Sequence, residues 1–120
     1  MTFAWLGWGA LCCAVSVVAG AFGAHGLESR LDTDALALWE TAARYLMYAG
    51  LGLMLMGARS ASTTGLPWSP VLLLAGSVVF SGTLFALALG APRWLGAVTP
   101  LGGLGMILGF LFFAWSALRS

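Results

Sequence analysis

Long apolar runs separated by short polar segments account for most of the chain. The runs cover residues 2–22, about 36–57, 71–91 and 94–118. Each is close to the roughly 20 apolar residues that an α-helix needs to cross a bilayer. Because short connections force consecutive helices to run antiparallel, the pattern predicts an all-α protein. We expect an integral membrane antiparallel four-helix bundle with short loops, built as one transmembrane domain over residues 1–120.

The composition supports the same class of protein. The chain is 61% hydrophobic and 8% charged, which lies outside the range of soluble domains. The six tryptophans fall near predicted helix ends, where indole rings collect at the headgroup level. No basic region precedes the first run and no clear cleavage site follows it, so we expect this run to remain as a helix.

The basic residues are all arginine, and alanine, glycine and leucine are abundant. This usage favours a GC-rich bacterial genome. We therefore expect a multi-pass protein of a bacterial cell (inner) membrane.

Small residues recur in steps of four, a spacing that lets helix backbones approach closely in lipid. The steps are Ser16, Gly20 and Ala24; Gly82, Ala86 and Gly90; and Gly105 with Gly109. We expect these steps to form the helix contacts. Cys12 and Cys13 are adjacent in mid-helix, so their side chains diverge, and we interpret them as packing residues without a disulfide.

The residues able to carry chemistry are concentrated between His25 and Tyr48. This stretch holds the single histidine, all four acidic residues and both tyrosines. The uncharged part of the second run, Tyr45 to Gly57, is about 20 Å long as a helix, against a hydrocarbon core of about 30 Å. Either this helix thins the membrane, or Glu40 and Arg44 are drawn below the headgroups.

On a helical wheel the second run has two distinct arcs. The polar arc consists of Glu40, Thr41, Arg44, Tyr45, Tyr48 and Gly52, and the opposite arc of Ala42, Ala43, Leu46, Ala49 and Leu53. We expect the polar arc to face the bundle interior. Hydroxyl side chains from the other helices lie at a similar depth, namely Ser16, Ser81, Thr83 and Thr99.

Two interpretations of these polar residues are compatible with the sequence. In the first they line a ligand pocket, with the first loop as its lid and Arg44 attracting a lipid phosphate or carboxylate. In the second, Glu40 and Arg44 form an interfacial ion pair, and each serine and threonine bonds a carbonyl of its own helix. The candidate ligand-binding residues are His25, Glu40, Arg44, Tyr45, Tyr48, Ser81, Thr83 and Thr99.

Other kinds of site find little support. His25 and Glu28 are spaced i, i+3, but two ligands fall short of a metal site, so no metal is predicted and His25 is expected to cap the first helix. Asp34, or Thr33 beside it, is the expected N-cap of the second helix. The chain has no nucleophile elbow, phosphate loop or CxxC motif, so we predict no catalytic residue and no cofactor. The low net charge of the chain and its predicted lipid surroundings exclude nucleic acid as a partner.

Four sequence blocks resemble the domain of unknown function 423 family. They are Gly20–Leu27, Trp39–Tyr45, Gly76–Thr83 and Arg93–Gly103, in this order. The resemblance implies a small four-helix bacterial membrane protein, related to eukaryotic transmembrane protein 256, without an established biochemical role. Relatives tend to show Tyr-Gln-x-x-His-Ala in the second helix, whereas this chain has the run from Tyr45 to Gly50. A role for that glutamine or histidine is therefore not carried over.

The leading functional hypothesis is a non-enzymatic bundle that binds a membrane lipid, a quinone or another amphipathic ligand, or serves as an accessory subunit of a larger membrane complex. One alternative is a small transporter or channel, formed as a homo-oligomer through the glycine-lined fourth helix. Another is an enzyme of membrane lipids or quinones that uses His25 and Glu40 as acid and base. Neither residue has a visible orienting partner, so we do not favour an enzyme.

Overall fold

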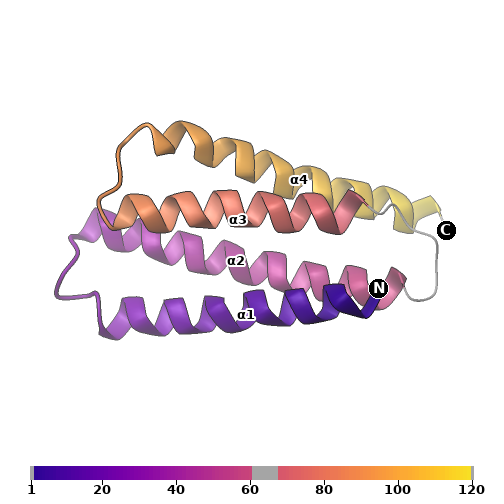
Figure 1. Ribbon diagram of the computed structural model, residues 1–120, viewed down its shortest axis with the longest axis horizontal. Helices are drawn as coiled ribbons and strands as arrows, with labels where there is room; N and C mark the ends of the chain where they lie inside the picture. The colour runs from indigo at the N-terminus through magenta and orange to yellow at the C-terminus, as the bar shows by residue number, and fades with distance from the viewer. Residues whose placement is uncertain (1, 61–67, 120) are drawn as a thin grey trace.

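The computed structural model, which describes residues 2–60 and 68–119, is built from long helices joined by short connections. The helices are α1 (Thr2–His25), α2 (Thr33–Ser60), α3 (Trp68–Ala88) and α4 (Leu95–Arg119). Figure 1 shows them side by side, each antiparallel to the next. The α1–α2 and α3–α4 connections lie at the same end, which we call the loop side. The predicted all-α, antiparallel four-helix bundle is confirmed.

Helix α3 starts and ends earlier than the run predicted for it. Pro70 lies in its first turn, where the missing N–H has no intrahelical partner to lose. Gly90 has a φ of 102°, a left-handed conformation that glycine adopts without a steric penalty and that ends the helix.

Within residues 2–60 and 68–119, three stretches are long and apolar enough to cross a membrane: Ala4–His25, Trp68–Ala88 and Leu95–Arg119. Helix α2 is the longest, with 28 residues, but its charged residues lower its mean hydropathy. Large apolar side chains point outward, as in Val18, Leu101 and Leu118, which are 68%, 67% and 86% exposed. This outward placement fits lipid as the surrounding solvent.

The helices pack in chain order, α1 on α2, α2 on α3 and α3 on α4. Figure 1 shows α1 and α4 at opposite edges of the molecule. Helices α2 and α3 are therefore central, and the bundle is open along α1 and α4.

Small residues in a seven-residue repeat form the seam between α1 and α2. The repeat consists of Gly9, Ser16 and Gly23 on α1 and Ala43, Gly50 and Gly57 on α2. A Cβ added to Gly9 would lie 2.6 Å from the carbonyl oxygen of Gly50. The repeat matches left-handed helix packing, which has a period of about 3.5 residues.

The seam between α3 and α4 is equally tight. A Cβ on Gly76 would lie 2.7 Å from the carbonyl oxygen of Gly102 and 2.6 Å from the amide nitrogen of Met106. Gly105 and Gly109 also face α3, as predicted: a Cβ on each would lie 3.1 Å from Gly76 Cα and 2.9 Å from the Leu73 amide nitrogen, respectively.

The other steps of four were largely wrong. A Cβ added to Gly20, Gly82 or Gly90 would meet nothing within 4 Å. Ala24 is exposed, and of the α1 step only Ser16 is buried in a seam. The reason is geometric, since strict steps of four drift away from a neighbour packed with a period of about 3.5 residues.

Helix α2 is hydrogen-bonded to both neighbours through consecutive carbonyl groups. The Ser16 hydroxyl of α1 donates to the Ala43 carbonyl at 2.5 Å. The Ser81 hydroxyl of α3 donates to the Ala42 carbonyl at 2.8 Å. These bonds fix α1, α2 and α3 at one common depth.

Trp39 makes a third link between helices. Its indole N–H donates to the Ala19 carbonyl at 2.7 Å. The ring occupies the space beside Gly23, where an added Cβ would lie 2.6 Å from Trp39 Cδ1. Its centroid is 4.5 Å from that of Phe85 on α3. Trp39 thus joins α1, α2 and α3, a role that its position near a helix end did not reveal.

Replacing Gly76 by alanine should destabilise the protein, because the new methyl group would collide with backbone atoms of α4. Overpacking of this kind costs about 1–3 kcal/mol. Unfolding in detergent micelles would measure the loss for Gly76→Ala, with Gly82→Ala on the same helix as the matched control. Equal stabilities of the two variants would contradict the packing described here.

Ser81→Ala should weaken the bundle by about 0.6 kcal/mol, and at most about 1.7 kcal/mol, the range for hydrogen bonds between membrane helices. Ser77→Ala is the control, since the Ser77 hydroxyl donates to Leu74 of its own helix at 2.9 Å. That bond survives when the helices separate. The same unfolding assay should therefore rank Ser81→Ala below Ser77→Ala, and the reverse order would refute the assigned role of Ser81.

Candidate functional site

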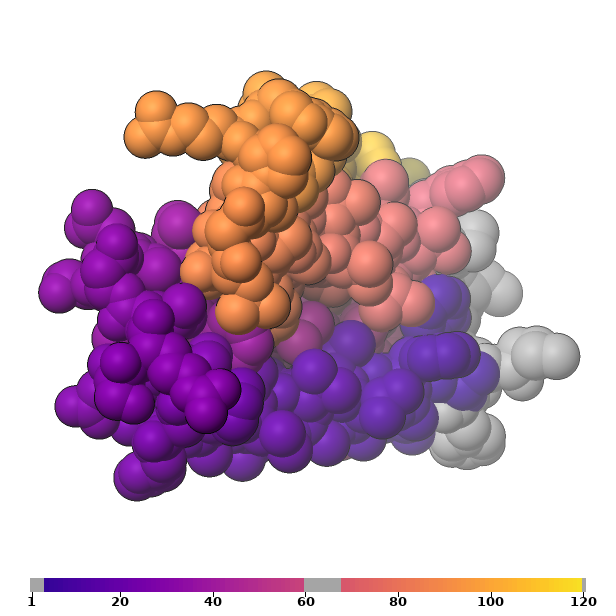
Figure 2. All heavy atoms as spheres, turned by 60° about the vertical axis from the view of Figure 1, so that its left-hand side comes forward, coloured from indigo at the N-terminus to yellow at the C-terminus, as the bar shows by residue number. Residues whose placement is uncertain are grey.

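An apolar groove runs between α1 and α3, with α2 as its floor. Its volume is about 300 Å³, which is at the lower end for ligand sites. Helix α1 contributes Trp8 and Val15, α2 contributes Leu46, and α3 contributes Ser81, Gly82 and Phe85, among others. In Figure 2, atoms of α2 (magenta) are visible between α1 (indigo) and α3 (salmon).

The hydroxyl groups in the groove are already hydrogen-bonded. Ser77 donates to Leu74 of its own helix and Ser81 donates to Ala42 of α2. Cys12, whose thiol is free, is the buried member of the cysteine pair. Among the described residues that line the groove there is no carboxylate, imidazole or guanidinium. The groove can therefore hold an apolar chain but offers it no acid, base or charge.

Gly52 of the polar arc of α2 is buried, but the charged and aromatic residues of this arc point away from the interior, opposite to the prediction. Ala42, Ala49 and Leu53 are 0% exposed. Glu40 and Arg44, by contrast, are exposed. The reason is that close approach of α1 and α3 requires small side chains on α2, and its alanines supply them where the polar arc cannot.

The two tyrosines of the polar arc are also outside the groove. Tyr45 is 37% and Tyr48 is 47% exposed. Their rings lie 5.1 Å apart between centroids, and the Tyr45 ring is 5.0 Å from that of Phe80 on α3. They form an aromatic cluster on the outer side of the α2–α3 contact.

Glu40 and Arg44 make no ion pair with each other in the described part of the chain. The intrahelical pair expected in the second interpretation is thus not formed. Neither residue lines the groove. The charged residues and the apolar groove lie in different parts of the protein, so the single polar pocket of the first interpretation is not formed either.

Thr83 and Thr99 join α3 to α4. Their hydroxyl oxygens are 2.6 Å apart, and the Thr83 oxygen is also 2.8 Å from the Val79 carbonyl. Each hydroxyl has one proton, so one hydroxyl donates to the other, and the hydroxyl that accepts this bond donates its own proton to a carbonyl of its own helix. Neither threonine lines the groove, and both serve packing.

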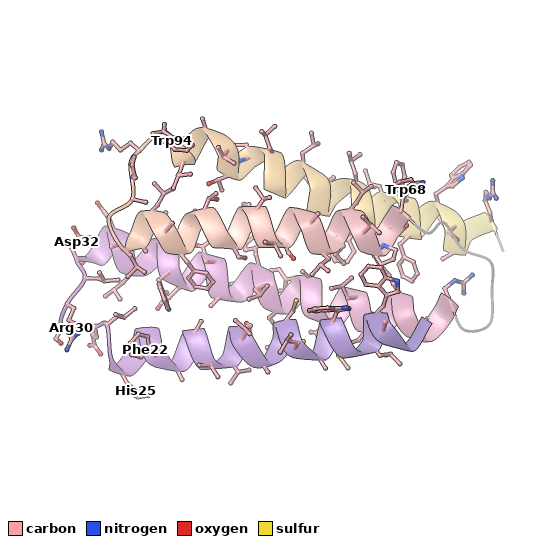
Figure 3. The ribbon with its side chains drawn as sticks, viewed as in Figure 1. Phe22, His25, Arg30, Asp32, Trp68 and Trp94 are labelled. Atoms are coloured by element: carbon pink, nitrogen blue, oxygen red, sulfur yellow. The ribbon has the colours of Figure 1, made fainter. Side chains whose placement is uncertain are left out.

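His25 is the last residue of α1 and is exposed, in keeping with its expected position at the helix end. Figure 3 shows it at the loop-side end, directed away from the other helices and apart from Arg30 and Asp32 on the loop. In the described part of the chain, no three His, Cys, Asp or Glu side chains lie together in a group that could hold a metal.

The N-cap of α2 differs from the prediction of Asp34 or Thr33. The Asp32 carboxylate accepts the amide N–H of Ala35 at 2.8 Å, which is the N-cap arrangement. The first loop thus serves to end α1 and to begin α2.

Sequence reasoning named Ser81, which lines the groove, but missed the groove itself because most of its lining is apolar. Val15, Leu46 and Phe85 resemble the apolar residues found throughout the chain. The sequence does not distinguish Gly82 from the glycines of the seams, although no backbone lies close to it and its missing side chain leaves one wall of the groove open.

Comparisons with known proteins agree with this architecture. Residues 19–103 match the family model described as "Protein of unknown function (DUF423)". The chain is 48% identical over 112 residues to a UPF0382 membrane protein of Staphylococcus haemolyticus, with 92% of each chain covered. It is 39% identical over 119 residues to the UPF0382 membrane protein YwdK of Bacillus subtilis, covering 92% of this chain and 93% of the relative.

No solved structure matches the chain. The family model covers more than half of the chain, and its relatives of known name are membrane proteins. The protein is therefore a membrane protein that belongs to the DUF423 family.

Proposed function

We propose that this protein is a non-enzymatic, multi-pass membrane protein whose groove binds the apolar chain of a membrane lipid or quinone. The observation that carries the proposal is the groove of about 300 Å³ with its apolar lining. Both serine hydroxyls that reach it are bonded to carbonyls. An apolar chain could enter from the membrane without losing hydrogen bonds.

The proposal includes four membrane passes, with α2 crossing beside its neighbours. Helix α2 has 28 residues, or about 42 Å at about 1.5 Å per residue, which exceeds the hydrocarbon core of about 30 Å. It contacts α1 near both ends, at Trp39 and at Gly57. The named relatives come from Staphylococcus and Bacillus, which favours a bacterial cell membrane.

The position of the charged residues favours binding over catalysis. An acid–base mechanism requires two titratable groups within reach of a bound substrate. His25 ends α1 and Glu40 lies on the outer side of α2, and neither lines the groove. Arg44 does not line the groove either. The protein would therefore recognise the apolar chain of the ligand and not its charge.

The oligomeric transporter is less favoured for a different reason. Its expected contact face was the glycine-lined fourth helix. Gly102 and Gly109 are buried against α3. These glycines therefore form a contact within one chain and are not available for contact with a second copy.

Gly82→Leu should fill the groove from the α3 wall, since an added Cβ meets no atom within 4 Å there. Gly96→Leu is the matched control, because Gly96 is equally open but lies on α4 outside the groove. Photoactivatable fatty acid and quinone analogues in proteoliposomes, followed by peptide mass spectrometry, would locate the bound chain. Labelling near Val15, Leu46 and Phe85 should fall severalfold in Gly82→Leu only.

Equal labelling of the two variants and the wild type would contradict the proposal. So would labelling spread evenly over the outward-facing side chains, because that pattern describes bulk lipid around a protein without a binding groove.

A further inference from the structure

The side of α2 turned away from α1 and α3 carries an exposed strip that no described residue of the chain covers. We call it the outer face of α2. Its members, all exposed, are Glu40, Arg44, Tyr48, Leu51 and Leu55. Leu51 and Leu55 are 51% and 65% exposed. The strip is apolar toward the middle of the helix and carries one charge of each sign toward the loop side.

The hydrogen bond from Ser81 to the Ala42 carbonyl sets the depth of these charges. Helix α3 has 21 residues, so it is about 31 Å long and about as thick as the hydrocarbon core. Ser81 lies about 10 Å before its loop-side end at Ala88. With the ends of α3 placed at the two edges of the core, the backbone of Arg44, just beyond Ala42 on α2, lies about 13 Å inside it.

A charge at this depth is costly. Arginine near the centre of a membrane helix is among the residues that insert least favourably. Side chains of a helix lean toward its N-terminus, so Arg44 extends toward the loop side. Glu40 lies in the same direction from Arg44, one helical turn closer to the headgroups.

The Glu40 carboxylate limits which groups can neutralise the charge of Arg44. An anionic headgroup that reached the guanidinium from the loop side would pass the Glu40 carboxylate and be repelled by it. A cation for Glu40 would likewise meet Arg44. The outer face needs a partner with both signs of charge, spaced one helical turn apart.

We propose that this partner is a second copy of the chain. With a two-fold axis perpendicular to the membrane, equal residues of the two α2 helices lie at equal depth, and the Arg44 side chain of each copy, which leans toward the loop side, would reach Glu40 of the other copy one turn away. Such an isologous contact satisfies all four charges with one geometry. The offset of one turn, about 6 Å, is within the reach of an arginine side chain. Leu51 and Leu55 of the two copies would pack against each other, farther from the loop side than the charges.

This dimer is independent of the proposed ligand. The groove opens between α1 and α3, whereas the outer face points the other way, so two associated copies would keep both grooves open. Binding and association can therefore fail separately.

Charge reversal with rescue between chains tests the dimer. The variant Glu40→Arg carries two cations on the outer face and Arg44→Glu carries two anions, so neither should associate with itself. Mixing the two variants should restore association, because each cation again meets an anion on the other copy. Fluorescence energy transfer between labelled chains in liposomes would measure it, with Arg93→Glu on the exposed α3–α4 connection as the control.

We expect self-association of each single variant to fall about tenfold or more, since like charges face each other at the contact. The mixture should recover to near the wild-type value. An ion pair within one helix cannot give this recovery, because both variants lack it. Wild-type chains that stay monomeric, single variants that associate normally, or a mixture without recovery would each overturn the proposal. Monomers that retain an anionic lipid would also overturn it.

A second variant keeps both charges and so does not depend on the folding of the reversed chains. In a background with Cys12→Ala and Cys13→Ala, Leu51→Cys should form disulfide-linked dimers in the membrane. Val18→Cys, on the lipid-facing side of α1, should not. Equal cross-linking at the two positions would overturn the assignment of the contact to α2.

Discussion

The close approach of helix backbones through small side chains is the constraint on which the rest of this structure depends. Lipid tails are as apolar as leucine, so membrane helices gain little from burying large apolar groups. They gain from contact between backbones, which needs glycine, alanine and serine at the seams. Gly9 against Gly50 and Gly76 against Gly102 are two such contacts. Large side chains are left to face the lipid.

This constraint also explains the orientation of α2. The helix lies between α1 and α3 and must present small residues to both. Ala43 accepts the hydroxyl of Ser16 and Ala42 accepts that of Ser81, so the alanine arc is the one that both neighbours can reach. Glu40 and Arg44 are turned outward as a consequence. Their exposure to lipid is the cost of packing α2 at the centre.

The same arrangement separates two features that a polar pocket would have combined. Because α1 and α3 both contact one side of α2, the space between them becomes an apolar groove. Because the charges occupy the other side of α2, they meet the surroundings of the protein and not its groove. An apolar groove on one side and a charged outer face on the other follow from a single helix orientation.

The sequence by itself determined the number of helices, their approximate ends and their antiparallel order. Length and hydropathy act within one segment, so the apolar runs could be interpreted without knowledge of any neighbour. Similarity over most of the chain added the family. The depth of Ser16 and Ser81 relative to Arg44 could also be counted along the helices.

Only the tertiary structure decided which face of each helix is buried. In the sequence, Gly20 and Gly82 cannot be told apart from Gly9 and Gly76. Yet nothing lies within 4 Å of a Cβ added to Gly20 or Gly82. A face is chosen by the distance and crossing of two backbones, which depend on residues of both helices at once. For the same reason the groove, the role of Trp39 and the outward position of Arg44 exist only once α1, α2 and α3 are assembled.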